Sequence, residues 1–185
     1  MRRKEVQLMK NFKYRLLTAL AVSLVAGGTA ISVVSAESPS QIQAASVSVA
    51  QAKKVALEAA PAGKVVSVDF EAKKDGRLYY EVTILEGNSE KEYKIDARTA
   101  SILNQKVEAI DDYEDSQLVQ ANLKLSFEDA ENILLQKYPQ AKIYDEELDI
   151  KAGQIVYQVK ALNGQQKIKM TLDANSGAVL QEKAK

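Results

Sequence analysis

The sequence predicts an α+β protein made of two tandem modules, each with one helix packed on an antiparallel three- to four-stranded sheet, after an N-terminal signal peptide. Three observations lead to this prediction. A long segment occurs twice in the chain, each copy begins with an apolar stripe at helical spacing, and each stripe is followed by alternating strands that turn residues separate.

The repeat covers most of the chain after its first quarter. Residues 48–103 align with residues 126–180 at an offset of 78 positions, which becomes 77 after one deletion. The aligned identities include caps, turns and core positions: Ser48 with Ser126, Pro61 with Pro139, Gly76 with Gly153, Tyr80 with Tyr157, Gly87 with Gly164 and Leu103 with Leu180. Such a mixture indicates two copies of one structural unit.

Residues 1–36 are organised as a secretory signal peptide. Basic side chains up to Arg15 precede an apolar run from Leu16, and Val34-Ser35-Ala36 supplies small residues before a cleavage site. This pattern predicts cleavage after Ala36. An uncleaved membrane anchor stays open as an alternative, because Leu16 to Ala36 carries no charge and is long enough to span a bilayer. Residues 37–47, rich in Ser, Gln and Ala, are predicted to be a flexible leader.

Each module is predicted to open with a helix. Ser48 and Ser126 are suitable N-caps, and Gln51 completes a capping box in the first copy. The stripe of the first helix is Val49, Ala52, Val55, Ala56 and Ala59, and that of the second is Phe127, Ala130, Ile133 and Leu134. Pro61 and Pro139 stop both helices from continuing.

In the first copy a strand rich in β-branched residues is predicted from Val65 to Phe70, and the turn Asp75-Gly76 separates it from the next strand. Leu78, Tyr80, Val82 and Ile84 alternate with Tyr79, Glu81 and Thr83, which predicts that the first set faces the helix and the second set faces away. An exposed aromatic side chain can anchor a protein partner. Tyr79, Glu81 and Thr83 are therefore the candidate partner-binding residues.

Residues 104–125 are predicted to be an acidic, solvated linker, and residues 181–185 a tail. The linker contains Asp111-Asp112-Tyr113-Glu114-Asp115. A calcium loop starting at Asp111 would need Gly at its sixth position and Glu at its twelfth, but these positions hold Ser116 and Asn122. Neither this run nor the group Asp145, Glu146, Glu147 and Asp149 is predicted to bind a metal.

Composition excludes several classes of function. The chain has no Cys and no His, so disulfides, thiolate metal sites, Cys nucleophiles and the commonest general base are absent. No G-x-S-x-G or S-x-x-K motif marks a catalytic serine. Removing the six basic groups and one acid of residues 1–36 from the 25 of each sign leaves 19 basic and 24 acidic groups, a net charge of −5. We therefore expect no enzyme activity, no cofactor and no nucleic-acid partner.

The two copies resemble the PepSY domain. The resemblance is carried by Ser48-Val49-Ala50-Gln51-Ala52, Asp75-Gly76-Arg77-Leu78-Tyr79-Tyr80-Glu81-Val82 and Tyr93-Lys94-Ile95-Asp96-Ala97-Arg98-Thr99, and again by Ser126 to Leu180. It implies a helix on an antiparallel sheet, export, and a role in restraining or modulating peptidases. Ala100, where the family usually has Gly, and Asp145-Glu146-Glu147, within an otherwise apolar strand, depart from the pattern.

The resulting functional hypothesis is an exported, non-enzymatic binding module, secreted or associated with the cell envelope, that modulates or inhibits an extracellular or envelope peptidase. The alternative is an interaction protein of the cell envelope with no peptidase partner. After signal cleavage no contact with the membrane is expected.

Overall fold

The computed structural model describes residues 37–111 and 113–185, so the predicted signal peptide over residues 1–36 lies outside the described residues. The first half contains α2 (Pro39–Ala44), α3 (Val49–Ala59), β1 (Lys64–Ala72), β2 (Leu78–Glu86), β3 (Ser89–Asp96) and β4 (Ile102–Ala109). The second half contains α4 (Tyr113–Gln120), α5 (Phe127–Lys137), β5 (Lys142–Lys151), β6 (Gln154–Asn163), β7 (Gln166–Asp173) and β8 (Val179–Ala184).

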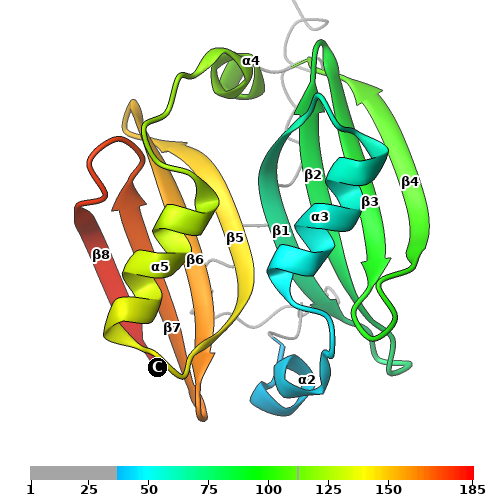
Figure 1. Cartoon of the computed structure of the whole chain (residues 1–185), viewed down its shortest axis with the longest axis vertical. Helices are drawn as coiled ribbons and strands as arrows, with labels where there is room; N and C mark the ends of the chain where they lie inside the picture. The colour runs from blue at the N-terminus through cyan, green and yellow to red at the C-terminus, as the bar shows by residue number, and fades with distance from the viewer. Residues whose placement is uncertain (1–36, 112) are drawn as a thin grey trace, which may run out of the picture. The chain divides into compact units, whose positions relative to one another are not determined.

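The strands of both halves belong to one antiparallel sheet, which confirms the predicted α+β class. The strand order is β4-β3-β2-β1-β5-β6-β7-β8, so each half supplies four consecutive strands. Helices α3 and α5 lie on the same face of this sheet, each over the strands of its own half (Figure 1). The repeat therefore builds two layers, with one helix and four strands per copy.

Both long helices begin where the sequence predicts. The Ser48 hydroxyl accepts a hydrogen bond from Gln51 N, and the Gln51 side chain accepts one from Ser48 N. Ser126 and Asp129 form the same capping box at α5. Because these bonds satisfy N–H groups that have no partner within the helix, the two serines determine where each helix starts.

The halves meet where β1 pairs with β5, through Ser67 opposite Glu147 and Val68 opposite Glu146. Val68 and Glu146 are equivalent positions of the repeat. Both strands also have a register shift at equivalent places, between Val65 and Ser67 in β1 and between Ile143 and Asp145 in β5. The two copies are thus related by a local two-fold axis that passes through the Val68–Glu146 pair.

The two cores exchange side chains across this junction. Val66 and Leu85 of the first half pack in the apolar cluster of the second half. Their repeat equivalents, Tyr144 and Leu162, pack in the cluster of the first half. Each half therefore completes the core of the other, and a chain segment of about 60 residues, close to the lower limit for independent stability, gains burial from its neighbour.

The expected flexible leader is instead partly helical. Residues 37–47 contain α2, and the side chain of Ile42 is fully buried in the first core. Lys142, which belongs to the second half, donates a hydrogen bond of 2.5 Å from Nζ to Ala45 O just after α2. A lysine that binds carbonyl oxygens at a helix C-terminus stabilises the helix end, and only the tertiary fold brings this one there.

The segment expected to be a solvated linker also differs from the prediction. Its first residues continue β4 to Ala109, and Tyr113–Gln120 form α4, in which Asp115 and Leu118 are buried. Lys64, the repeat equivalent of Lys142, donates from Nζ to Leu118 O and Ala121 O at 3.0 Å each. The expected tail likewise lies mostly within β8.

The departure at Ala100 has a structural consequence. Ala100 adopts a φ of 62°, while Gly177 at the equivalent position has a φ of 72°. Left-handed backbone costs an alanine about 1–2 kcal/mol because its Cβ crowds the following carbonyl, whereas glycine has no such penalty. The first copy thus keeps the turn geometry of the second despite the less suitable residue.

Candidate partner-binding surfaces

The predicted partner-binding residues lie together on one face of β2. Tyr80 is fully buried in the core beneath α3, with its hydroxyl donating to Val47 O at 2.9 Å. The alternation along β2 therefore places Tyr79, Glu81 and Thr83 on the face without the long helices, as the sequence predicts. Whether they bind a partner stays a prediction.

Tyr79, however, is not the exposed aromatic anchor that the sequence suggested. Its relative exposure is 7%. The Nζ atoms of Lys73 and Lys94 lie 5.3 and 5.6 Å from its ring centroid, and Lys94 also pairs with Glu81 at 3.1 Å. Long lysine stems cover apolar surface while their charged ends stay in contact with water, which is why the two-residue alternation gave the correct face but the wrong exposure.

The middle of this helix-free face carries a cluster of charges across the junction. Lys160 Nζ binds Asp145 at 2.9 Å, and Gln158 Nε2 donates to Glu147 at 2.6 Å. Burial is the main cause that raises the pKa of Asp69 well above its ordinary value, and repulsion by the charge of Asp145 adds to the effect. Burial also raises the pKa of Asp145, although Lys160 opposes this. In the sequence this cluster is indicated by Asp145-Glu146-Glu147, the acidic run that interrupts the apolar pattern of β5.

Glu146 points to the opposite, helix-covered face of the sheet. Its carboxylate is fully buried and binds Lys53 Nζ of α3 at 2.7 Å, and Lys53 also pairs with Glu131 of α5. Lys53 Nζ lies 5.1 Å from the ring centroid of Phe127. Burial raises the pKa of Glu146 to about 8. Sequence reasoning missed this group, because its members come from three elements that meet only in the folded chain.

Both edges of the sheet expose apolar side chains. On β4 the exposed residues are Ile102, Leu103 and Val107, and on β8 they are Val179 and Leu180. Ile102 and Leu103 are the repeat equivalents of Val179 and Leu180. Edge strands with apolar side chains can pair with another chain, so these edges are the second candidate surface.

The two edge strands differ in the side-chain bonds that they form with the end of the neighbouring helix. Glu182 of β8 binds Lys137 Nζ at 2.6 Å and accepts a hydrogen bond from the Tyr138 hydroxyl, so the end of α5 is tied to the edge strand. In the first copy the equivalent residues are Ala59, Ala60 and Gln105, which cannot form these bonds. No equivalent bonds therefore tie the end of α3 to β4.

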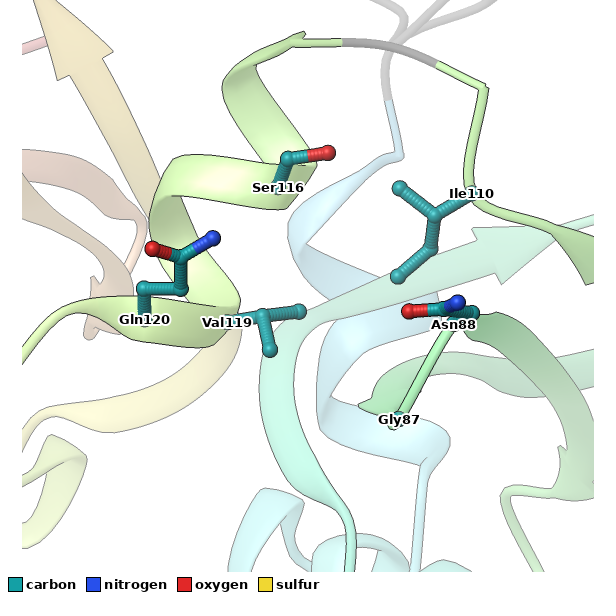
Figure 2. A pocket seen from close by; sticks show the side chains of 6 residues that line it. All are labelled: Gly87, Asn88, Ile110, Ser116, Val119 and Gln120. Atoms are coloured by element: carbon teal, nitrogen blue, oxygen red, sulfur yellow. The ribbon is translucent and has the colours of Figure 1, made fainter.

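A hollow of about 280 Å³ lies beside α4 and the β2–β3 turn (Figure 2). Its lining combines turn, loop and helix residues without any ionisable side chain: Gly87, Asn88, Ile110, Ser116, Val119 and Gln120. Within residues 37–111 and 113–185, no group of three or more acidic side chains is placed to hold a metal ion. None of the described helices is long and apolar enough to cross a membrane.

Comparison with known proteins identifies the repeat. The family model described as peptidase propeptide and YPEB domain (PepSY) matches residues 46–106 and 124–183. No curated protein sequence gives a significant match.

Three solved structures are similar to the chain. A lipoprotein candidate from Clostridium difficile 630 is 19% identical, with 75% of this chain and 93% of that one covered and a TM-score of 0.47. A DUF2874 family protein from Bacteroides uniformis ATCC 8492 is 13% identical over 73% and 88% of the two chains, with a TM-score of 0.28. The YpeB C-terminal domain of Bacillus megaterium is 15% identical over 75% and 65%, with a TM-score of 0.31.

Proposed function

The chain belongs to the PepSY family, and from this membership we propose that it is an exported, non-enzymatic binding module that modulates or inhibits an extracellular or envelope peptidase. The observation that carries the proposal is the match of both halves to a family that includes peptidase propeptides. A propeptide acts by binding its peptidase, so the property that a PepSY module must supply is a surface.

The chemistry of the chain supports a binding role. The full sequence lacks Cys and His, the side chains that most often act as nucleophile and general base in hydrolases. The described residues instead offer a broad charged sheet face and two edges with exposed apolar side chains. Extended peptides bind to such sheet edges through main-chain hydrogen bonds.

Export is part of the proposal. The signal sequence of residues 1–36 should be removed after Ala36, because Val34-Ser35-Ala36 has small residues at the required positions. N-terminal sequencing of the exported protein should then begin at Glu37. Recovery of the intact chain from the membrane fraction would support the retained anchor instead.

A peptidase-inhibition assay tests the function. Residues 37–185 are added to a purified thermolysin-type metallopeptidase and, separately, to culture supernatant of the producing cells, with a fluorogenic peptide as substrate. We expect slower hydrolysis that saturates with the amount of added protein. A Tyr80→Ala variant, which loses a core aromatic side chain, is the control for an effect that needs the folded module. Capture of an envelope protein without any effect on hydrolysis would favour the interaction protein with no peptidase partner.

A further inference from the structure

The outer side of β4 has hydrogen-bonding groups available along the strand. Among the described residues, β4 pairs with β3 alone and ends the sheet. Ile110 N donates to Asn88 O at 2.9 Å, so the main-chain groups of Ile110 and, by alternation, of Glu108 point toward β3. The N–H and C=O of Val107 therefore point away from β3, toward the open side.

The helix side of this edge exposes two apolar side chains, one on each side of Gln105, whose side chain donates to the Tyr93 hydroxyl. Ile102 and Val107 are 44% and 53% exposed, and the register of β4 with β3 places both on the side that α3 occupies. In the second copy, the bonds from Lys137 and Tyr138 to Glu182 bring the helix end over the edge strand. The alanines at the end of α3 make no such bonds to β4, and Ile102 and Val107 stay exposed to contact with another apolar side chain.

The opposite side of the same edge has an excess of negative charge. Strands β2, β3 and β4 place four carboxylates but only two lysines on this side. The carboxylates are Glu81, Glu90, Glu92 and Glu108, and the lysines are Lys94 and Lys106. Lys94 lies 3.1 Å from Glu81 and 3.7 Å from Glu92 and so serves both. Burial and the neighbouring charge of Glu81 raise the pKa of Glu92, as expected where carboxylates outnumber cations.

We propose that the outer edge of β4 accepts an extended segment of a partner protein that alternates apolar with basic side chains, which adds a ninth strand to the sheet. The apolar side chains would contact Ile102 and Val107, and the basic ones would face the carboxylates of the opposite side. This inference rests on the proposed binding role but not on the partner being a peptidase. A second copy of the chain suits the edge less well, because it brings the same excess of carboxylates and a net charge of −5 over residues 37–185.

Proline substitution separates strand addition from folding. Val107→Pro removes an outward N–H and places a ring on the open side, while the bonds of β4 to β3 remain, since proline is tolerated where the N–H of an edge strand faces solvent. Ala184 is the repeat equivalent of Val107 on β8. It is also directed outward, because the next residue, Lys185, exchanges both main-chain hydrogen bonds with Lys167. Ala184→Pro is therefore the matched control.

The probes are fluorescein-labelled peptides of β4's length that alternate Val with Lys or Val with Glu, and binding is measured by fluorescence anisotropy. We expect the Val–Lys peptide to bind, the Val–Glu peptide to bind at least about tenfold more weakly, and Val107→Pro to weaken the Val–Lys peptide by about tenfold or more. Ala184→Pro should leave this affinity unchanged. Glu108→Lys tests the same surface without proline and should reduce the preference for lysine.

Several results would overturn the proposal. One is equal binding of both peptides; another is equal loss from the two proline variants, provided that thermal melts show both to be folded. If neither peptide binds and sedimentation shows a dimer that Val107→Pro converts to a monomer, the occupant is a second copy. If the Val–Lys peptide binds but no peptidase is inhibited, the proposed function fails while the strand-addition site stands.

Discussion

Replacing Glu146 by Gln tests whether the buried carboxyl at the junction is protonated at neutral pH. Glutamine has nearly the shape of a protonated glutamic acid but does not titrate. The carboxyl is fully buried between α3, α5 and the sheet, with Lys53 Nζ at 2.7 Å and Glu131 as the other acid at that lysine. Burial raises the pKa of Glu146 from 4.5 to about 8.

The sign of the effect follows from this direction. Between pH 4.5 and about 8, Glu146 keeps its proton in the folded chain but loses it in the unfolded chain. The stabilisation is thus complete below about pH 4.5 and is lost as pH rises through about 8. Each tenfold difference in proton affinity is worth about 1.4 kcal/mol, so the loss across this window approaches about 5 kcal/mol as an upper limit and should be observed as about 3–5 kcal/mol.

Urea unfolding followed by circular dichroism at intervals from pH 5 to pH 9 measures the effect. We expect the free energy of unfolding of Glu146→Gln to nearly match that of the unsubstituted chain near pH 5, to exceed it by a growing margin up to about pH 8, and to keep a constant margin above that. Other buried acids such as Asp145 contribute to the pH dependence of both proteins, so the difference between the two curves isolates position 146. Glu131→Gln, which removes the other carboxylate at Lys53, is the control and should keep the decline. Parallel curves for Glu146→Gln and the unsubstituted chain would show that the carboxyl stays ionised throughout, and the reasoning would be wrong.

Four further substitutions test the packing, and thermal or urea melts measure each. Tyr80→Ala should cost about 3–5 kcal/mol, as expected for a fully buried aromatic side chain, whereas Tyr79→Ala should cost about 1–2 kcal/mol because only lysine stems and charges cover its ring; a larger loss at position 79 would reverse the assignment of faces. Lys64→Met removes two hydrogen bonds to the end of α4 and should lower stability by about 1–2 kcal/mol and expose α4 to proteases, so unchanged proteolysis would argue against this anchoring role. Gly177→Ala should cost about 1–2 kcal/mol, because φ is 72° and the added Cβ would lie 3.0 Å from Ile133 Cδ1; a neutral result would mean that the turn tolerates Ala as readily as it does at position 100.

Sequence alone was sufficient for the features that depend on neighbours along the chain. Ser48 and Ser126 cap their helices because a cap needs only a hydroxyl and the next few residues. The alternation through Tyr79 and Tyr80 predicted the correct faces of β2, because the two-residue period is a property of the strand itself. The repeat predicted two similar units, since equal patterns fold into equal elements.

The tertiary structure decided everything that one copy does to the other. No local sequence pattern indicates that the eight strands form a single sheet. None indicates either that Val66 packs in the second core while Tyr144 packs in the first. The same holds for the helices that replaced the expected leader and linker, because Lys64 and Lys142 reach them from the opposite half. The run Asp145-Glu146-Glu147 looks solvated in a linear sequence. In the fold Asp145 and Glu146 are buried, with Lys160 of the neighbouring strand β6 paired to Asp145 and Lys53 of the other half paired to one oxygen of Glu146.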